Sequence, residues 1–153
     1  MDSNTCEMLL NEAHKARSYA YCPYSHFAVG AAVLCSDGSV FTGCNIENAA
    51  YSPGNCAERT AVFKAVSEGK RRFLAIAIAG GREDTSAETP CWPCGVCRQV
   101  LREFDDGNLV IVTGNGAGGL TAKTLRELLP MSFSADDLKS TKAANDNPCK
   151  KER

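Results

Sequence analysis

The sequence has little of what several common classes of protein require. Its net charge is −1, and it contains only two histidines among 153 residues. A protein that binds polynucleotides needs a basic face for the phosphates, and this charge balance gives no support for one. The longest apolar stretches are too short to span a bilayer, and the N-terminus lacks the charged and apolar regions of a signal peptide. We therefore expect a cytoplasmic protein with no nucleic-acid or membrane partner.

Nine cysteines, by contrast, are many for a chain of this length. In the absence of a signal peptide, reduced cytosolic thiols explain them better than disulfides do. Two short stretches, Cys-Ala-Glu-Arg at 56–59 and Pro-Cys-Gly-Val-Cys at 93–97, each resemble the first turn of a helix. The cysteines outside these stretches are interpreted as small hydrophobic or surface residues; they are Cys6, Cys22, Cys35, Cys44, Cys91 and Cys149.

The cysteines of the two stretches predict a metal site. Cys94 and Cys97 are three residues apart, which places both thiols on one face of a helix. With Cys56 they offer three soft ligands, a set that favours zinc over magnesium or calcium. Three protein ligands leave the fourth tetrahedral position open, as in catalytic zinc sites, whereas a structural zinc would need a fourth ligand. Glu58 is close enough in sequence to Cys56 to take a proton from a water molecule at that position.

Three thiolates around a divalent ion carry a net charge of −1, which weakens the ion as a Lewis acid. A nearby positive group should offset this charge. Arg59 lies one turn along from Cys56, and helix N-termini add partial positive charge and N–H donors. We therefore assign Arg59 a supporting role around the metal, and we expect its loss to damage zinc affinity or rate.

A second Cys-x-x-Cys spacing competes for the metal, because Cys91 precedes Cys94 by three residues. We choose Cys94 and Cys97, since residues 98–104 have a helix-forming composition with a regular apolar face. Pro93 fits immediately before that helix, where its missing N–H costs little. Cys91 is then expected in the preceding loop, away from the helical face.

These motifs resemble the zinc-dependent cytidine deaminases of pyrimidine salvage. The likeness extends beyond the cysteines to residues 24–32, 43–51 and 127–130, and covers the chain from about Ala13 to about Leu138. It implies one zinc ion per chain and hydrolytic deamination of cytidine and deoxycytidine to uridine and deoxyuridine. A deaminase of a nucleoside antibiotic such as blasticidin S and a non-catalytic zinc-binding module remain as alternatives. The stretch 45–51 argues against the first alternative, and Glu58 beside Cys56 against the second.

The resemblance also implies which residues bind the substrate. The matching phenylalanine, Phe27, would pack against the pyrimidine ring, although a core aromatic is the simpler interpretation. Asn45 and Glu47 would bind the sugar hydroxyls, although they could instead cap a turn after a strand. Ala57 is assigned to the substrate side, and Phe133 would enter the site of a neighbouring subunit in a homotetramer, unless it only fills the core.

The pattern along the chain predicts an α/β fold. An amphipathic helix is expected over 5–20, ended by Pro23, followed by a hairpin of strands 27–34 and 40–44. Helices from Cys56 to about Glu68 and from Cys94 onward alternate with strands 73–79 and 109–113, and a short helix is expected over 124–129. The glycine-rich residues 114–119 predict a turn. The resemblance implies a three-layer α/β/α fold with a mixed five-stranded sheet in residues 1–138, and the polar residues 139–153 predict a disordered tail.

Overall fold

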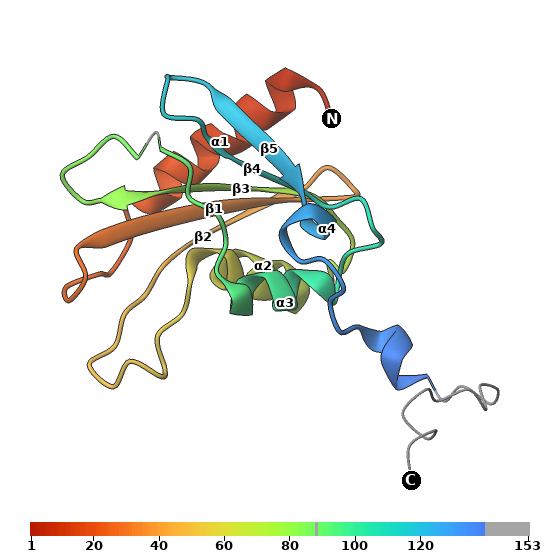
Figure 1. The fold of residues 1–153 in the computed structure, drawn as a ribbon. Coiled ribbons are helices and arrows are strands. Elements are labelled where there is room, and N and C mark those ends of the chain that lie inside the picture. The colour runs from red at the N-terminus through yellow and green to blue at the C-terminus, as the bar shows by residue number, and fades with distance from the viewer. Residues whose placement is uncertain (88, 140–153) are drawn as a thin grey trace, which may run out of the picture.

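A mixed five-stranded sheet forms the centre of the molecule (Figure 1). The computed structural model describes residues 1–87 and 89–139. The strands are β1 (Phe27–Cys35), β2 (Val40–Cys44), β3 (Phe73–Arg82), β4 (Val110–Gly114) and β5 (Leu120–Thr124). The helices are α1 (Ser3–Arg17), α2 (Ala57–Ser67), α3 (Gly95–Arg102), α4 (Leu125–Leu128) and the 3₁₀ turn η1 (Ala135–Leu138).

The order of the strands confirms the expected topology. It is β2-β1-β3-β4-β5, with β3 and β4 parallel and the other neighbouring pairs antiparallel. The predicted hairpin is β1 with β2, and the predicted strand 73–79 is part of β3, which is third of the five strands. A parallel pair needs a crossover connection, and the segment containing α3 provides it.

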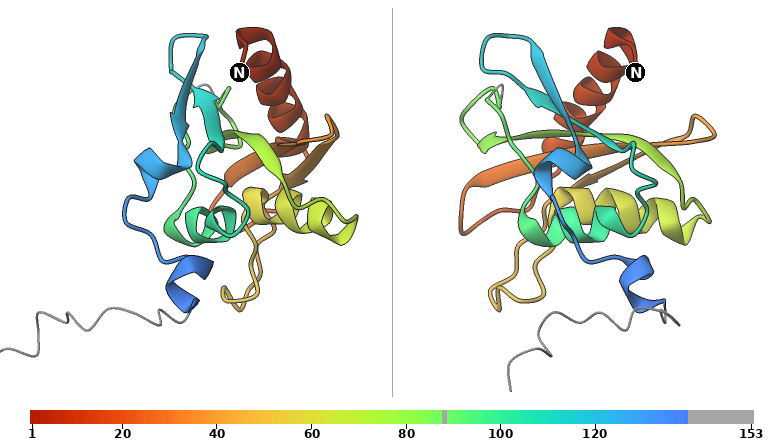
Figure 2. Two further views of the ribbon diagram at one scale, coloured as in Figure 1. Left: turned by 90° about the vertical axis from the view of Figure 1, so that its right-hand side faces the viewer. Right: turned by 45° about the vertical axis from the view of Figure 1, so that its right-hand side comes forward.

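Helices cover both faces of the sheet, which gives the three expected layers. Figure 2 shows α1 on one face and α2 with α3 on the other. The apolar residues divide in the same way. One buried cluster joins Leu9 and Ala13 of α1 to Ala77 of β3. A larger cluster joins α2 and Leu101 of α3 to the opposite side chains of the sheet, such as Ile76. Alternate residues of β3 therefore serve two cores.

Three boundaries differ from those expected from the sequence. α1 ends at Arg17, before the expected residue 20, and the Arg17 guanidinium donates hydrogen bonds to carbonyl oxygens of residues 28, 81, 82 and 85. β3 continues through Arg82 into a stretch expected to be loop. Strand β5 was not recognised from its residues, since as an edge strand it has little buried apolar surface. The predicted tail lies almost entirely outside the described residues, which end at Lys139.

The residues expected to form a turn between β4 and β5 do so. The side-chain oxygen of Asn115 accepts hydrogen bonds from the backbone of Ala117 at 2.8 Å and Gly119 at 3.1 Å. No helix in the described part of the chain has both the length and the apolar character needed to cross a membrane.

Close contact between α2 and β2 depends on Gly43. A Cβ at this position would overlap the Ala61 backbone nitrogen and lie 2.8 Å from the Ala57 carbonyl oxygen. The backbone of β2 at Gly43 therefore lies directly against the backbone of the first turns of α2. Since α2 begins directly after Cys56, this contact also fixes where the metal-site residues lie.

Replacement of this glycine tests that support. We expect Gly43→Ala to lower the free energy of unfolding by about 3 kcal/mol, because rigid backbone atoms must move to admit the methyl group. Gly95→Ala is the matched control, since nothing lies within 4 Å of a Cβ there. Thermal or urea unfolding of both variants gives the comparison. Equal effects of the two substitutions would contradict this account of the contact.

Candidate metal centre and adjoining pocket

Two helix N-termini bring three cysteines together. Cys56 is the N-cap residue of α2 and Cys94 is that of α3, while Cys97 lies in the first turn of α3. The sulfur atoms of Cys56 and Cys94 are 3.9 Å apart, and all three sulfur atoms lie within 4.8 Å of one another. Zinc–sulfur bonds of about 2.3 Å at tetrahedral angles require sulfur atoms about 3.8 Å apart. The three thiols therefore fit a zinc ion.

The surroundings of Cys56 favour the deprotonated form of its thiol, which is the form that binds metal. Hydrogen bonding by the Cys97 thiol and by the Arg59 guanidinium lowers the pKa of the Cys56 thiol, despite an opposing effect of burial. One guanidinium nitrogen of Arg59 lies 3.6 Å from the Cys56 sulfur. Its Nε atom is buried without a hydrogen-bond partner, which is costly unless negative charge lies close by. Arg59 is thus positioned for a negatively charged sulfur cluster.

Glu58 is a buried carboxyl group beside these thiols. Its residue is only 5% exposed, although it lines a pocket with Cys56 and Cys94. Burial raises the pKa of the Glu58 carboxyl, and charge on Cys56 adds to this effect, while hydrogen bonding from Cys97 opposes it. A carboxyl with a raised pKa exchanges protons more readily near neutral pH. The pairing of an open three-thiol cluster with such a group suits a hydrolytic reaction.

The pocket beside the cluster is large enough for a nucleoside-sized molecule. Its volume is about 660 Å³, within the usual range for small-molecule sites. It lies between the start of β1, the loop that follows β2, and the starts of α2 and α3. The predicted site residues that line it, besides the two thiols, are Phe27, Asn45, Glu47, Ala57, Glu58 and Arg59.

Phe27 is not a core aromatic, because its residue is 42% exposed at the pocket. Asn45 holds the backbone on both sides of Ala28, at the start of β1. Its Oδ1 accepts a hydrogen bond from Val29 N at 2.8 Å, and its Nδ2 donates to Phe27 O at 2.9 Å. Glu47 accepts hydrogen bonds from the backbone N–H groups of Tyr24 at 3.0 Å and Ser25 at 3.2 Å. Asn45 therefore holds the start of β1 and Glu47 the segment before it, while both residues line the pocket.

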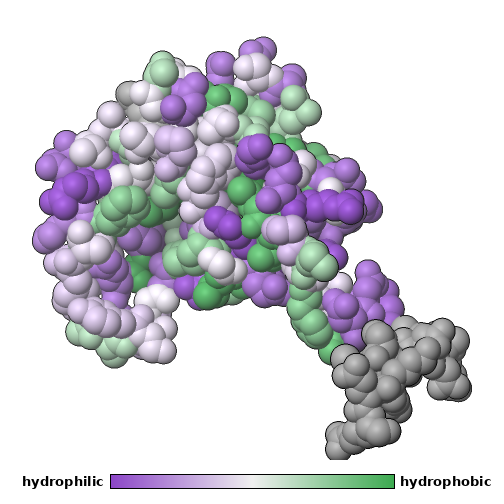
Figure 3. Space-filling model, viewed as in Figure 1, coloured by the Kyte–Doolittle hydropathy of each residue, from purple (hydrophilic) through white to green (hydrophobic). Residues whose placement is uncertain are grey.

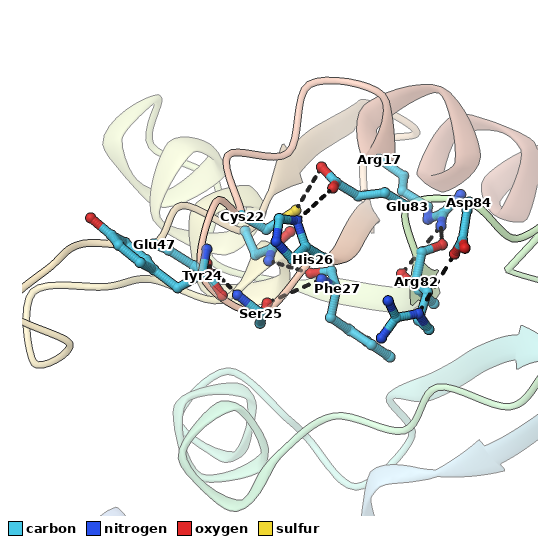
Figure 4. Close-up of polar contacts among 12 residues, drawn as sticks. Arg17, Cys22, Tyr24, Ser25, His26, Phe27, Glu47, Arg82, Glu83 and Asp84 are labelled. Carbon is cyan, nitrogen blue, oxygen red and sulfur yellow. Dashed lines mark hydrogen bonds and ion pairs between the residues drawn. The ribbon is translucent and has the colours of Figure 1, made fainter.

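A second carboxylate holds the same segment from its other side (Figure 4). Glu83 accepts a hydrogen bond from the Cys22 thiol at 3.3 Å and pairs with Nδ1 of His26 at 3.2 Å. Its backbone N–H also donates to His26 O at 3.0 Å. Sequence reasoning missed this network, because Glu83 is 57 and 61 residues from its partners. No local spacing could have indicated it.

Phe133 lies elsewhere. Its residue is 58% exposed and it is not among the residues that line this pocket. Its backbone oxygen accepts a hydrogen bond from the Gln99 side chain at 3.0 Å, which fixes the segment against α3. Phe133 therefore neither fills the core of this chain nor enters this chain's own site.

Other lining residues were not assigned a role from the sequence. Tyr24 and Tyr51 meet edge to face with ring centroids 6.3 Å apart at the pocket. Cys91 and Trp92 also line it. Among the described residues, only Cys56, Cys94 and Cys97 form a cluster able to hold a metal, and Cys91 lies outside it. Burial, with a further effect of charge on Glu58, raises the pKa of the Cys91 thiol to about 11.

Comparison with known proteins agrees with this combination of fold and site. Residues 3–113 match the family model of the cytidine and deoxycytidylate deaminase zinc-binding region. A protein of Sporosarcina psychrophila named cytidine deaminase is 52% identical over 132 residues, which are 86% of this chain and 93% of the relative. A cytidine deaminase of Mycobacterium tuberculosis is 43% identical over 131 residues, covering 86% and 91% of the two chains.

Solved structures give the same result. The crystal structure of cytidine deaminase from Burkholderia pseudomallei has a TM-score of 0.74 and 46% identity, and the match covers 83% of this chain and 98% of that one. Fold and metal-binding thiols together define a zinc-binding α/β protein with a pocket of small-molecule size. More particularly, the chain belongs to the cytidine and deoxycytidylate deaminase zinc-binding family.

Cysteine replacements test which thiols hold the metal. We expect Cys94→Ser to lose its zinc, because a hydroxyl is a poor substitute for one of three thiolate ligands. Cys91→Ser should retain its zinc, since Cys91 lies outside the cluster. The measurement is the zinc content of each purified protein after dialysis. Cys94 belongs to both spacings, so loss of zinc from Cys91→Ser together with its retention by Cys97→Ser would show that the competing Cys-x-x-Cys spacing is the correct one.

Proposed function

We propose that this chain catalyses the hydrolytic deamination of cytidine and deoxycytidine to uridine and deoxyuridine, releasing ammonia, in pyrimidine salvage. The observation that carries the proposal is the buried Glu58 carboxyl beside three clustered thiols in one pocket. The names of the relatives support the choice of substrate. The same comparisons do not favour a nucleoside-antibiotic deaminase, and a non-catalytic zinc module would have no use for Glu58.

In the proposed mechanism, three cysteines bind the metal and Glu58 transfers the protons. Cys56, Cys94 and Cys97 would hold the zinc ion. Bound zinc supplies Lewis acidity that lowers the pKa of a water molecule from about 15.7 toward about 7. Glu58 would accept one proton from the attacking water and donate it to ring N3, while the water oxygen bonds to the pyrimidine C4 carbon. It would then take the second proton of that oxygen and donate it to the amine as the C4–N bond breaks, which leaves a carbonyl group at C4. One water is consumed for each ammonia released, and Glu58 returns to its starting state.

Arg59 serves the same reaction through Cys56. Its guanidinium lies beside the Cys56 sulfur and offsets part of the charge of the three thiolates. The N-termini of α2 and α3 contribute partial positive charge at Cys56 and Cys94. The metal thereby keeps more of its acidity than three thiolates alone would leave it.

The remaining lining residues would bind the nucleoside. Phe27 offers an exposed ring face or edge to the pyrimidine, beside Ala57, whose small side chain keeps the pocket open. Asn45 and Glu47 would bind the sugar hydroxyls. Their hydrogen bonds to the backbone around Tyr24 and Phe27 hold these acceptors and donors in place before substrate arrives. A free base would leave such groups without their partner and would bind less well.

The active form in this proposal is a homotetramer. Several apolar residues are exposed around α3 and after α4, where Figure 3 shows hydrophobic residues gathered among hydrophilic ones. They are Val96, Met131, Phe133 and Leu138, which are 58% to 104% exposed. Phe133 would complete the site of a neighbouring subunit. The proposal also places the catalytic domain in residues 1–138 and the protein in the cytoplasm.

Replacement of Glu58 tests the proposal. We expect Glu58→Gln to retain zinc but to lose at least about a thousandfold in turnover of cytidine, since an amide cannot carry the protons. Glu68→Gln at the exposed C-terminus of α2 is the control, with unchanged turnover expected. Ammonia release and zinc content are measured on the same samples. A Glu58→Gln protein that turns over at the wild-type rate would overturn the assigned role.

A further inference from the structure

The wall of the pocket contains a thiol that the proposed mechanism does not use. Cys91 lines the pocket together with Glu58, Cys56 and Cys94. Its sulfur occupies a space that exists because residue 80 is glycine, where a Cβ would overlap the Cys91 sulfur. The same hypothetical Cβ would lie 3.3 Å from Cγ2 of Val29. Val29, Gly80 and Cys91 thus form one continuous piece of wall at the ends of β1 and β3.

This piece of wall is held rigidly. The backbone N–H of Cys91 donates to Oγ1 of Thr113 at 2.9 Å, and Thr113 is fully buried in β4. Two residues later, the carbonyl oxygen of Pro93 accepts a hydrogen bond from Nε of Arg98 at 2.7 Å. The segment is therefore fixed on both sides of Trp92. Cys91 cannot move away when a molecule enters the pocket.

Cys91 also lies at the reacting end of the pocket. Cys91 and Glu58 line the same pocket, and Cys91 lies three residues before Cys94 of the metal cluster. In the proposed mechanism Glu58 serves ring N3, so C5, the other ring atom next to the reacting carbon, is the one left to face this wall. Since the thiol is uncharged at neutral pH, it presents a small apolar surface to that atom.

We propose that Cys91 is a specificity-determining residue that sets how large a substituent the pyrimidine can carry at C5, the ring carbon next to the reacting carbon. The inference rests on the proposed deaminase function and refines its substrate class to include cytosine nucleosides substituted at C5. The direction of the effect follows from the packing. Because the sulfur already fills the space at Gly80, a larger side chain at position 91 can extend only into the pocket.

A series of side-chain sizes tests the inference. Cys91→Ala, Cys91→Val and Cys91→Ile are compared with the wild type on cytidine, 5-methylcytidine and 5-iodocytidine. The quantity measured is the ratio of kcat/KM for each substituted nucleoside to that for cytidine, divided by the wild-type ratio to remove electronic effects of the substituent. Zinc content is measured on every sample. Cys35→Ala, which removes a buried core thiol that does not line the pocket, is the matched control.

We expect the ratio for 5-iodocytidine to fall at least about 10-fold in Cys91→Ile and to rise about 3-fold in Cys91→Ala, with Cys91→Val between them. Cys35→Ala should leave it unchanged. Competitive inhibition by uridine and 5-iodouridine, which needs no turnover, should follow the same order. A ratio independent of the side chain at position 91 would overturn the inference while leaving the deaminase function intact. Absence of cytidine turnover in zinc-loaded wild type would overturn both.

Discussion

Three sulfur atoms must stay close together and remain negatively charged, and the rest of the structure depends on meeting this requirement. Thiolates repel one another, and burial adds to the cost of their charge. Two features offset this negative charge. Cys56 and Cys94 are the N-cap residues of α2 and α3, and the Arg59 guanidinium lies beside the Cys56 sulfur. Zinc supplies the remaining positive charge.

The fold keeps these helix starts in register. α2 rests on β2 through the backbone contact at Gly43, and α3 forms part of the crossover between the parallel strands β3 and β4. Arg98 of α3 ties the helix to Pro93 and also to Leu128 O at 2.7 Å. The two helices therefore share one apolar core with the sheet, and small errors in their positions would be costly. This packing therefore fixes the positions of the three metal-binding cysteines.

Much of this arrangement was predictable from the sequence, for identifiable reasons. The hairpin, the central strand β3 and the helix after Cys56 follow from local periodicity and turn residues. The clustering of three thiols followed from ligand chemistry and spacing. By contrast, the hydrogen bonds that anchor Arg17 at the end of α1 go to carbonyl groups of β1, of β3 and of the turn after β3, and β5 is placed by its pairing with β4. The Glu83 network and the fit of Cys91 against Gly80 likewise join distant residues. Such contacts leave no local pattern.

The most direct test of the central claim is ammonia release from cytidine by the purified wild-type protein, with zinc content measured on the same sample. The account predicts turnover that rises with zinc occupancy, disappears after chelation, and returns when zinc but not magnesium is added back. A preparation with a full complement of zinc on its thiols and no release of ammonia from cytidine or deoxycytidine would contradict it.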